Sequence, residues 1–329
     1  MKQVALRIHY LIMLFLLVFI LGLSTSFLWR PNPQKIEKEK NIHQLGYTYI
    51  SPLLECADNQ YSVSRITSLE KEIRLFINKE KEKDNIEDIS IYFHNLSDDS
   101  WLSINRDNKF SPASLLKVPL MISYLKLAEK DPSVLQQKIK VLPIEMQTNI
   151  QNIIPEKSVI PEKEYTIEEL IKYSINYSDN LAANTLLAHI DENFMNKIYT
   201  DLGLPIPGSG DIENFMTVRE YASFFEILYN ASYLSEKMSE KALFILTGSI
   251  FNNGLKAGIP DNVPLAHKFG ERIFENSKQL HDCGIIYMYK NPYLLCVMTK
   301  AEASSSLDFS ELENIISSIS LKTYNHLSK

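Results

Sequence analysis

The chain has 329 residues, of which 45% are hydrophobic and 22% charged, with 34 basic and 40 acidic side chains. This composition is typical of a folded globular protein and excludes disordered, collagen-like and coiled-coil classes. The formal charge of -6 provides no overall basic field, and no Lys/Arg-rich stripe alternates with aromatic residues. We therefore expect no nucleic-acid partner.

The first 30 residues have the pattern of a membrane segment. Residues 8–29 contain no Asp, Glu, Lys or Arg, and Lys2 and Arg7 precede them. A helix of this length is long enough to cross a hydrocarbon core of ~30 Å, and the basic start favours an N-inside orientation. We predict a signal anchor at residues 1–30, with the remainder outside the cytoplasm, at the cell surface or in the periplasm. The small residues 24–26 leave open a cleaved signal peptide and a secreted protein.

After this segment the chain becomes acidic. Residues 31–329 carry 31 basic against 40 acidic side chains. Residues 31–46 contain two prolines and alternating Lys and Glu, which is typical of a solvated linker. A single domain is expected to occupy residues 47–329 and to act as a monomer.

The predicted elements begin with a helix at residues 68–83, where apolar residues recur among charged ones. Short β-type runs at residues 89–93 and 101–104, separated by Asn and Asp, predict a hairpin. Another helix is expected at residues 114–130. From residue 144 to 251 the chain reads as almost wholly helical, with capping-box patterns at 166–169 and 217–220.

Strands return at residues 263–269, 283–287 and 293–299, before a final amphipathic helix at 309–323. Strands at both ends of a domain belong to one sheet when only helices separate them. The order therefore predicts an α/β (α+β) fold. In it, an antiparallel sheet carries the terminal helices on one face, and an all-helical lobe docks on the other.

The pattern Ser-x-x-Lys is a candidate nucleophile and base, because a lysine three residues after a serine lies on the same helical face. The chain contains it twice, at Ser68–Lys71 and at Ser114–Lys117. We interpret Ser68 as a helix N-cap and Lys71 as a solvated side chain. The second copy follows the predicted hairpin and is flanked by leucines and valine, so Lys117 is expected to be buried with a lowered pKa.

Two further motifs follow in order: Ser178-Asp179-Asn180 between helical stretches, and Lys268-Phe269-Gly270 on a predicted strand. With Ser114–Lys117, this series resembles the serine β-lactamase and penicillin-binding protein superfamily, specifically its class A β-lactamase-like branch. The resemblance covers roughly residues 89–322.

The resemblance implies a role for each matched residue. Ser114 would be the acylated nucleophile and Lys117 its base, while Ser178 would relay a proton to the leaving nitrogen. Asn180, Lys268 and Gly270 would belong to the substrate-binding side. The backbone N–H groups of Ser114 and Glu271 would form an oxyanion hole.

The chain departs from the family pattern at two places. Phe269 replaces the usual hydroxyl-bearing residue, so we expect it to point into the sheet and Arg272 to offer an alternative contact for a substrate carboxylate. The Glu-x-x-Leu-Asn loop of class A enzymes is absent, and residues 204–216 form a shorter loop. Glu213 is the only glutamate in it, either a general base or an exposed loop acid. Deacylation is accordingly expected to be slow.

Two other constellations carry less weight. His267, His281 and Asp282 permit a Ser/His/Asp triad, but Lys117 already provides a base beside Ser114. Cys283 and Cys296 fall on neighbouring strands and could face each other diagonally, but we expect buried thiols.

The sequence thus predicts an extracytoplasmic serine acyl hydrolase that needs no metal or cofactor and acts on β-lactams or D-Ala-D-Ala-type peptides. A peptidoglycan DD-peptidase and a non-catalytic binding or sensor domain remain alternatives. The complete set of motif residues argues against the non-catalytic domain.

Overall fold

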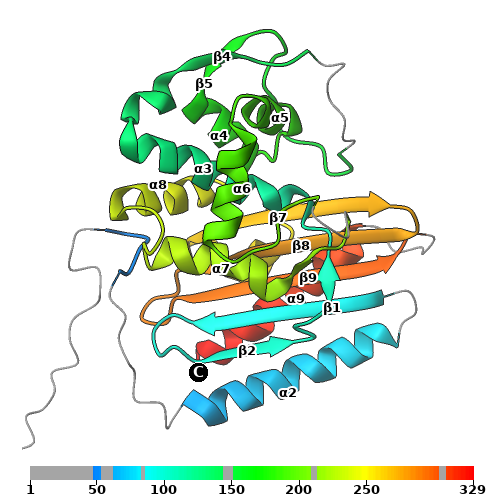
Figure 1. The fold of residues 1–329 in the computed structure, drawn as a ribbon. Coiled ribbons are helices and arrows are strands. Elements are labelled where there is room, and N and C mark those ends of the chain that lie inside the picture. Colours follow the sequence, from blue (N-terminus) through cyan, green and yellow to red (C-terminus); the bar gives the residue numbers. More distant parts are fainter. Residues whose placement is uncertain (1–46, 53–61, 83–85, 144–150, 209–212, 304–308) are drawn as a thin grey trace, which may run out of the picture. The chain divides into compact units, whose positions relative to one another are not determined.

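The computed structural model describes residues 47–52, 62–82, 86–143, 151–208, 213–303 and 309–329 (Figure 1). The described helices, in chain order, are α2 (Ser62–Lys81), α3 (Lys117–Lys130), α4 (Ile167–Asn176), α5 (Asn180–Ala188), α6 (Glu192–Asp201), α7 (Val218–Tyr229), α8 (Glu236–Leu246) and α9 (Phe309–Leu327), with 3-10 turns η2 (Ala113–Leu116), η3 (Pro132–Gln136) and η5 (Leu255–Gly258). The strands are β1 (Ile86–Asn95), β2 (Trp101–Ile104), β3 (Lys109–Phe110), β4 (Lys138–Lys140), β5 (Glu164–Thr166), β6 (Met216–Thr217), β7 (Leu265–Phe274), β8 (Ser277–Ile286) and β9 (Tyr293–Glu302).

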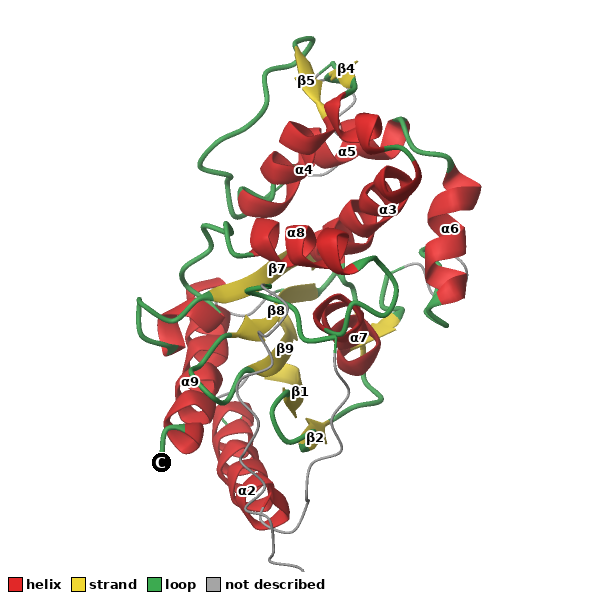
Figure 2. Cartoon of the chain, turned by 90° about the vertical axis from the view of Figure 1, so that its left-hand side faces the viewer, coloured by secondary structure: helices red, strands yellow, loops and turns green. Residues whose placement is uncertain are grey.

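A five-stranded sheet forms the centre of the fold, in the order β2-β1-β9-β8-β7 with antiparallel neighbours. The first two strands of the chain thus pair with the last three, across the whole helical block. This confirms the predicted single sheet. It also leaves β7 at one edge, beside the helical lobe, as Figures 1 and 2 show.

Both faces of the sheet are buried, because successive residues of β9 belong alternately to two hydrophobic cores. Leu294, Cys296 and Met298 belong to the core beneath the helical lobe. Leu295 and Val297 belong to a second core, which α2 and α9 cover. In Figure 2 these two helices lie on one side of the sheet and α7 on the other. Successive strand residues point to opposite faces, so a strand covered on both sides needs apolar residues at nearly every position.

Capping residues start two of the helices that frame the lobe. The hydroxyls of Thr166 and Thr217 accept hydrogen bonds from the backbone N–H of Glu169 and Glu220, at the starts of α4 and α7. Each glutamate in turn accepts from the backbone N–H of its threonine. Both are the capping boxes predicted from the sequence.

Several boundaries differ from prediction. Helix α2 begins at Ser62, so Ser68 lies inside the helix and is not its N-cap. Strand β5 lies within the stretch predicted to be almost wholly helical and pairs with β4 just ahead of it, a ladder that was not predicted. Strands β7 and β8 extend beyond the predicted runs into a hairpin that includes residues 270–282. Several of these residues are charged or polar, so apolar periodicity does not register them.

The cysteine prediction was wrong. Cys283 and Cys296 occupy directly paired positions of β8 and β9, with Cα atoms 4.0 Å apart, and form a disulfide. Cys56 lies outside the described residues.

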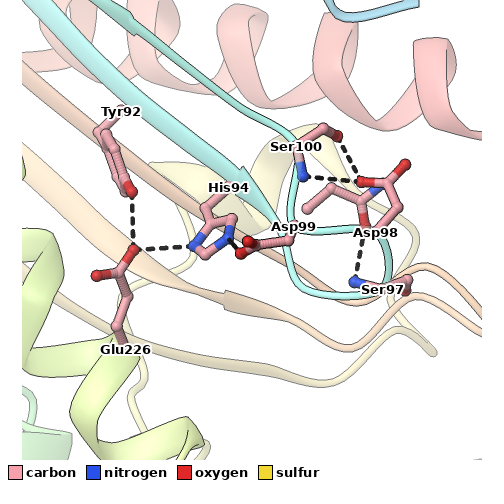
Figure 3. Close-up of polar contacts among 8 residues, drawn as sticks. Tyr92, His94, Ser97, Asp98, Asp99, Ser100 and Glu226 are labelled. Carbon is pink, nitrogen blue, oxygen red and sulfur yellow. Dashed lines mark hydrogen bonds and ion pairs between the residues drawn. The ribbon is translucent and has the colours of Figure 1, made fainter. Parts of the chain in front are cut away.

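A cluster of polar side chains joins the β1–β2 hairpin to α7 (Figure 3). The Glu226 carboxylate of α7 accepts hydrogen bonds from the Tyr92 hydroxyl at 2.8 Å and lies 2.9 Å from the His94 Nδ1 atom. The other ring nitrogen of His94 is 2.7 Å from an Asp99 carboxylate oxygen. A protonated imidazole donates on both sides, so the cluster fixes α7 on the sheet. This matters for the site because α7 follows the loop that carries Glu213.

Among the residues that the structure describes, no helix is both long and apolar enough to cross a bilayer. Residues 1–46, which include the predicted anchor and linker, lie outside those residues, so both remain predictions.

Candidate active site

Ser114 lies in the tight turn η2, immediately before α3. Ala113 ahead of it has a positive φ of 47°, and Leu115 behind it is fully buried. The carbonyl of Leu115 accepts a hydrogen bond from the Tyr221 hydroxyl of α7 at 3.1 Å. The buried side chain of Leu115 and the hydrogen bond from Tyr221 therefore fix the turn, while Ser114 stays partly exposed. Lys117 begins α3 one turn later, is 7% exposed, and places its Nζ atom 3.0 Å from the Ser114 Oγ atom.

Ser178 and its neighbours form the loop between α4 and α5. Ser178 has a positive φ of 55°, a conformation that costs a non-glycine residue free energy. Asp179 offsets part of that cost: one carboxylate oxygen accepts from the N–H of Leu181 at 2.9 Å and the other from the N–H of Val159 at 2.8 Å. Asp179 thus caps α5 and pins the loop through backbone contacts.

The Lys117 amine connects the first two motifs. Besides Ser114, its Nζ atom hydrogen-bonds to the Ser178 carbonyl at 2.6 Å, the Ser178 hydroxyl at 3.1 Å and the Asn180 Oδ1 atom at 2.7 Å. Burial lowers the pKa of Lys117 to about 7, against the smaller opposing effects of the Asp179 and Glu271 carboxylates. A substantial fraction of Lys117 is therefore neutral near pH 7, as a base for the Ser114 hydroxyl requires.

The third motif meets the second on β7. The Lys268 Nζ atom donates to the Ser178 hydroxyl at 2.8 Å and to the Phe269 carbonyl at 2.8 Å, and its side chain is fully buried. Burial and the nearby Lys117 amine lower the pKa of Lys268 well below its usual value. Phe269 stacks on Phe251 with ring centroids 4.1 Å apart, in the core that α2 and α9 cover. The prediction that Phe269 points into the sheet is confirmed.

Gly270 permits the close approach of β7 to the η2 turn. A Cβ atom at this position would lie 2.8 Å from the Pro112 carbonyl oxygen and 3.1 Å from the Leu115 nitrogen. Only glycine avoids this overlap, which explains the last residue of the motif. The backbone of Glu271 is thereby held beside the turn that carries Ser114.

Arg272 and Glu213 bind each other. The Arg272 Nε and Nη2 atoms lie 2.6 and 3.2 Å from the two carboxylate oxygens of Glu213, a bidentate pair between β7 and the short loop. Both residues line the same pocket as Ser114. The sequence had offered Arg272 as a carboxylate contact and Glu213 as a possible base, and the structure presents them as partners.

Sequence reasoning missed a segment that crosses from the Ser178 loop to β7. The Gln151 side chain donates to the Ser178 carbonyl at 2.9 Å and accepts from the Asn180 N–H at 3.3 Å. The Glu271 carboxylate accepts from the backbone N–H and the side-chain amide of Asn152, each at 2.7 Å. No local pattern marks these residues, because their contacts join positions 27 to 119 apart in the chain.

The residues of the alternative Ser/His/Asp triad and of the first Ser-x-x-Lys copy do not line the pocket. His267 pairs with Asp282 at 2.9 Å, both buried, and His281 lies 2.9 Å from the Ser111 carbonyl oxygen. In the described part of the chain, none of the three hydrogen-bonds to Ser114. Ser68 and Lys71 are exposed on α2, distant from the pocket lining.

The residues of the three motifs lie beside a pocket of about 740 Å³. Ser114, Lys117 and Asn180 line it together with Gln151 and Glu271, whereas Ser178 and Lys268 are buried behind its wall. The arrangement provides a serine beside a partly neutral lysine, and a second lysine oriented on the relay serine. That combination suits transfer of an acyl group to Ser114.

Comparison with known proteins gives the same result. A family model described as the β-lactamase enzyme family matches residues 68–327. The chain belongs to this family. Its enzymes are serine hydrolases of the β-lactamase type, in agreement with the resemblance of the three motifs.

The relatives and neighbours of this β-lactamase-family protein are remote in sequence. β-Lactamase VEB-1 of Pseudomonas aeruginosa is 26% identical over 266 residues, covering 72% of this chain and 85% of the relative. Among solved structures, the TLA-3 extended-spectrum β-lactamase aligns with a TM-score of 0.68 at 20% identity, over 80% of this chain and 99% of the other. A mutant of PBP-A, solved as an acyl-enzyme complex with penicillin G, aligns with a TM-score of 0.66 at 21% identity, over 80% and 97%.

Proposed function

We propose that β-lactams, and peptides ending in D-Ala-D-Ala, acylate this protein at Ser114. The observation that carries the proposal is the 3.0 Å contact between Lys117 Nζ and Ser114 Oγ, at a lysine whose pKa burial lowers to about 7. The penicillin G acyl-enzyme of a PBP-A mutant, a structural neighbour, supports the choice of substrate.

Each step can be assigned to a residue. Neutral Lys117 takes the Ser114 proton as Oγ attacks the carbonyl carbon of the scissile amide. The backbone N–H groups of Ser114 and Glu271 stabilise the negative charge that forms on the carbonyl oxygen, a contribution of about 10²- to 10³-fold in rate per donor. As the C–N bond breaks, Ser178 passes its proton to the leaving nitrogen and regains one from Lys117. Lys268 orients Ser178 through its 2.8 Å hydrogen bond and offers its amine as a donor to the substrate carboxylate.

Hydrolysis of the acyl-enzyme is proposed to be slow. Deacylation needs a base positioned on a water molecule near the ester. Glu213, the glutamate of the short loop, is bound on both carboxylate oxygens by Arg272. A carboxylate held this way is a poor acceptor for a water proton, so the acyl-enzyme should persist.

The same observation favours a second candidate function, a DD-peptidase of peptidoglycan. Release of D-alanine from a diacylated tripeptide ending in D-Ala-D-Ala separates it from a β-lactamase.

We also propose that residues 1–30 anchor the domain outside the cytoplasm. The charge-free run at residues 8–29, preceded by Lys2 and Arg7, supports this. The full-length protein should stay with the membrane pellet after alkaline carbonate extraction. Its release into the supernatant would overturn the anchor.

Labelling by a fluorescent penicillin tests the nucleophile. The native protein and Ser68→Ala should be labelled equally, because Ser68 is exposed on α2 and does not line the pocket. Ser114→Ala should give no labelled band, and Lys117→Ala should label at least 10²-fold more slowly. Labelling that survives Ser114→Ala and disappears with Ser68→Ala would reverse the assignment.

A further inference from the structure

We propose that Gln151 is a positioning residue for acylation: its side-chain amide fixes the Ser178 loop on the Lys117 amine. This inference rests on the proposed function, because acylation of Ser114 is the reaction that it serves. It adds a residue that belongs to none of the three motifs.

The Gln151 amide contacts two peptide groups of the Ser178 loop at once. Its Nε2 atom donates to the Ser178 carbonyl at 2.9 Å, and its Oε1 atom accepts from the Asn180 N–H at 3.3 Å. A carbonyl only accepts and an N–H only donates, so a side chain that meets both must offer a donor and an acceptor together. An amide does so, whereas a carboxylate lacks the donor. These two bonds also offset part of the cost of the positive φ of 55° at Ser178.

The backbone next to Gln151 is attached to β7. The Glu271 carboxylate accepts from the backbone N–H and the side-chain amide of Asn152, each at 2.7 Å, and from the Ile153 N–H at 3.3 Å. Gln151 itself is half-buried and lines the pocket. Its side chain therefore reaches the Ser178 loop from a backbone that three hydrogen bonds hold on the opposite wall of the site.

The Ser178 carbonyl connects Gln151 to the proposed base. That oxygen also accepts from Lys117 Nζ at 2.6 Å, and the same amine contacts the Ser178 hydroxyl at 3.1 Å and the Asn180 Oδ1 atom at 2.7 Å. All three acceptors belong to the loop that Gln151 holds. A small displacement of this loop would change all three contacts together, and with them the 3.0 Å approach of Lys117 to Ser114.

The shared oxygen also makes residue 151 an electrostatic neighbour of Lys117. Two nitrogens that hydrogen-bond to one oxygen lie within the distance of about 4–6 Å over which an opposite charge raises the pKa of an amine by about one to three pH units. The neutral Gln151 amide adds no such charge, so the pKa of Lys117 stays at about 7. Asp179, Glu271 and Lys268 also face Lys117.

Gln151→Met tests the positioning role, because it keeps the length of the side chain and removes both hydrogen bonds. Stopped-flow measurements over a range of benzylpenicillin concentrations separate the first-order acylation constant from the dissociation constant of the initial complex. The acylation constant should fall roughly tenfold, and the dissociation constant should stay within about twofold. An unchanged acylation constant overturns the proposal. A change confined to the dissociation constant also overturns it, because Gln151 would then be a substrate contact.

Gln151→Glu provides a readout that a merely structural role would not move. The new carboxylate stabilises the Lys117 ammonium, so the base becomes neutral only at higher pH. The pH midpoint of acylation should therefore rise from about 7 to about 8–9. Gln137→Glu is the matched control, because it adds the same charge at an exposed position outside the pocket lining and should keep the midpoint. Equal midpoints in the two Glu variants overturn the proposal.

The two variants of Gln151 make the test independent of the folding of either one, which unfolding curves check against the wild type. Failure of the proposed function gives a different result. If benzylpenicillin forms no adduct with the wild type, acylation at Ser114 is refuted, and the role of Gln151 in it falls as well. If the wild type is acylated and both Gln151 variants behave like it, the positioning role alone is refuted.

Discussion

The Nζ atoms of Lys117 and Lys268 both hydrogen-bond to the hydroxyl of Ser178, at 3.1 and 2.8 Å. Two buried amines that share one neutral oxygen repel each other when both are charged, and burial already disfavours each charge. Burial lowers the pKa of Lys117, and burial together with the Lys117 amine lowers the pKa of Lys268. The same hydrogen-bonded group thus places a base, Lys117, at Ser114 and connects it to the Ser178 hydroxyl, through which a proton can pass.

Acylation should depend on pH through Lys117. With its pKa lowered to about 7 by burial, Lys117 becomes neutral as the pH rises through that value. The acylation rate constant for benzylpenicillin should rise about tenfold per pH unit below pH 7 and level off above it. Stopped-flow or quenched measurements between about pH 5 and pH 9 provide the profile. A rate constant independent of pH across this range would exclude Lys117 as the base.

Replacing Lys268 with Met should separate activity from stability. The variant loses the 2.8 Å contact to Ser178, and acylation should slow by about 10- to 150-fold, the equivalent of one charged hydrogen bond. The unfolding free energy should stay the same or increase, because the hydrogen bonds of this buried amine go to neutral oxygens only. Chemical denaturation measures the unfolding free energy. A variant that is both inactive and clearly destabilised would show that Lys268 mainly supports the fold.

Glu213→Gln should leave the lifetime of the acyl-enzyme unchanged within about twofold, because Arg272 already binds both carboxylate oxygens. Intact mass at intervals after acylation gives that lifetime. Stability should fall by about 0.5–1 kcal/mol through loss of the ion pair. A lifetime prolonged tenfold or more would instead identify Glu213 as the residue that activates water.

The cluster in Figure 3 should make stability depend on pH. Burial by itself lowers the pKa of His94, but the hydrogen bonds that its ring donates to Glu226 and Asp99 outweigh it, so the folded-state pKa is raised above 6.5. The stabilisation is therefore complete below about pH 6.5 and is lost as the pH rises through the folded-state pKa. The same contacts lower the pKa of Glu226 despite its burial, so that carboxylate stays charged at about pH 5.5.

His94→Gln should accordingly cost about 1.5–3 kcal/mol at about pH 5.5 and clearly less at about pH 8.5. Urea unfolding of both proteins at the two pH values measures the difference. Arg219 also faces this cluster, with its guanidinium 5.8 Å from the Tyr92 ring centroid. An equal loss at both pH values would mean that His94 contributes packing and no charge.

The candidate site residues could be picked out from the sequence because the family motifs are short and local. Ser114 and Lys117 are one helical turn apart, and the Ser178 and Lys268 motifs are each contiguous in sequence. The single antiparallel sheet followed from strands at both ends of the domain, and the structure confirms it. The catalytic roles of the motif residues stay predictions.

The contacts that the sequence did not predict join residues that are far apart in the chain. Arg272 and Glu213 are 59 positions apart, and their pairing depends on the length of the short loop. The contact of Asn152 with Glu271 spans 119 positions. The disulfide of Cys283 requires the exact register of β8 against β9, and a shift of one residue would turn its side chain to the other face.

The central claim is tested most directly by the intact mass of the full-length protein, followed for minutes after mixing with benzylpenicillin. The account predicts a gain of one penicillin, retained over that time, in the wild type and in Ser68→Ala, and no gain in Ser114→Ala. An adduct that persists in Ser114→Ala, or a wild-type protein whose mass never changes, would contradict acylation at Ser114. An adduct that disappears as hydrolysed drug accumulates would contradict slow deacylation.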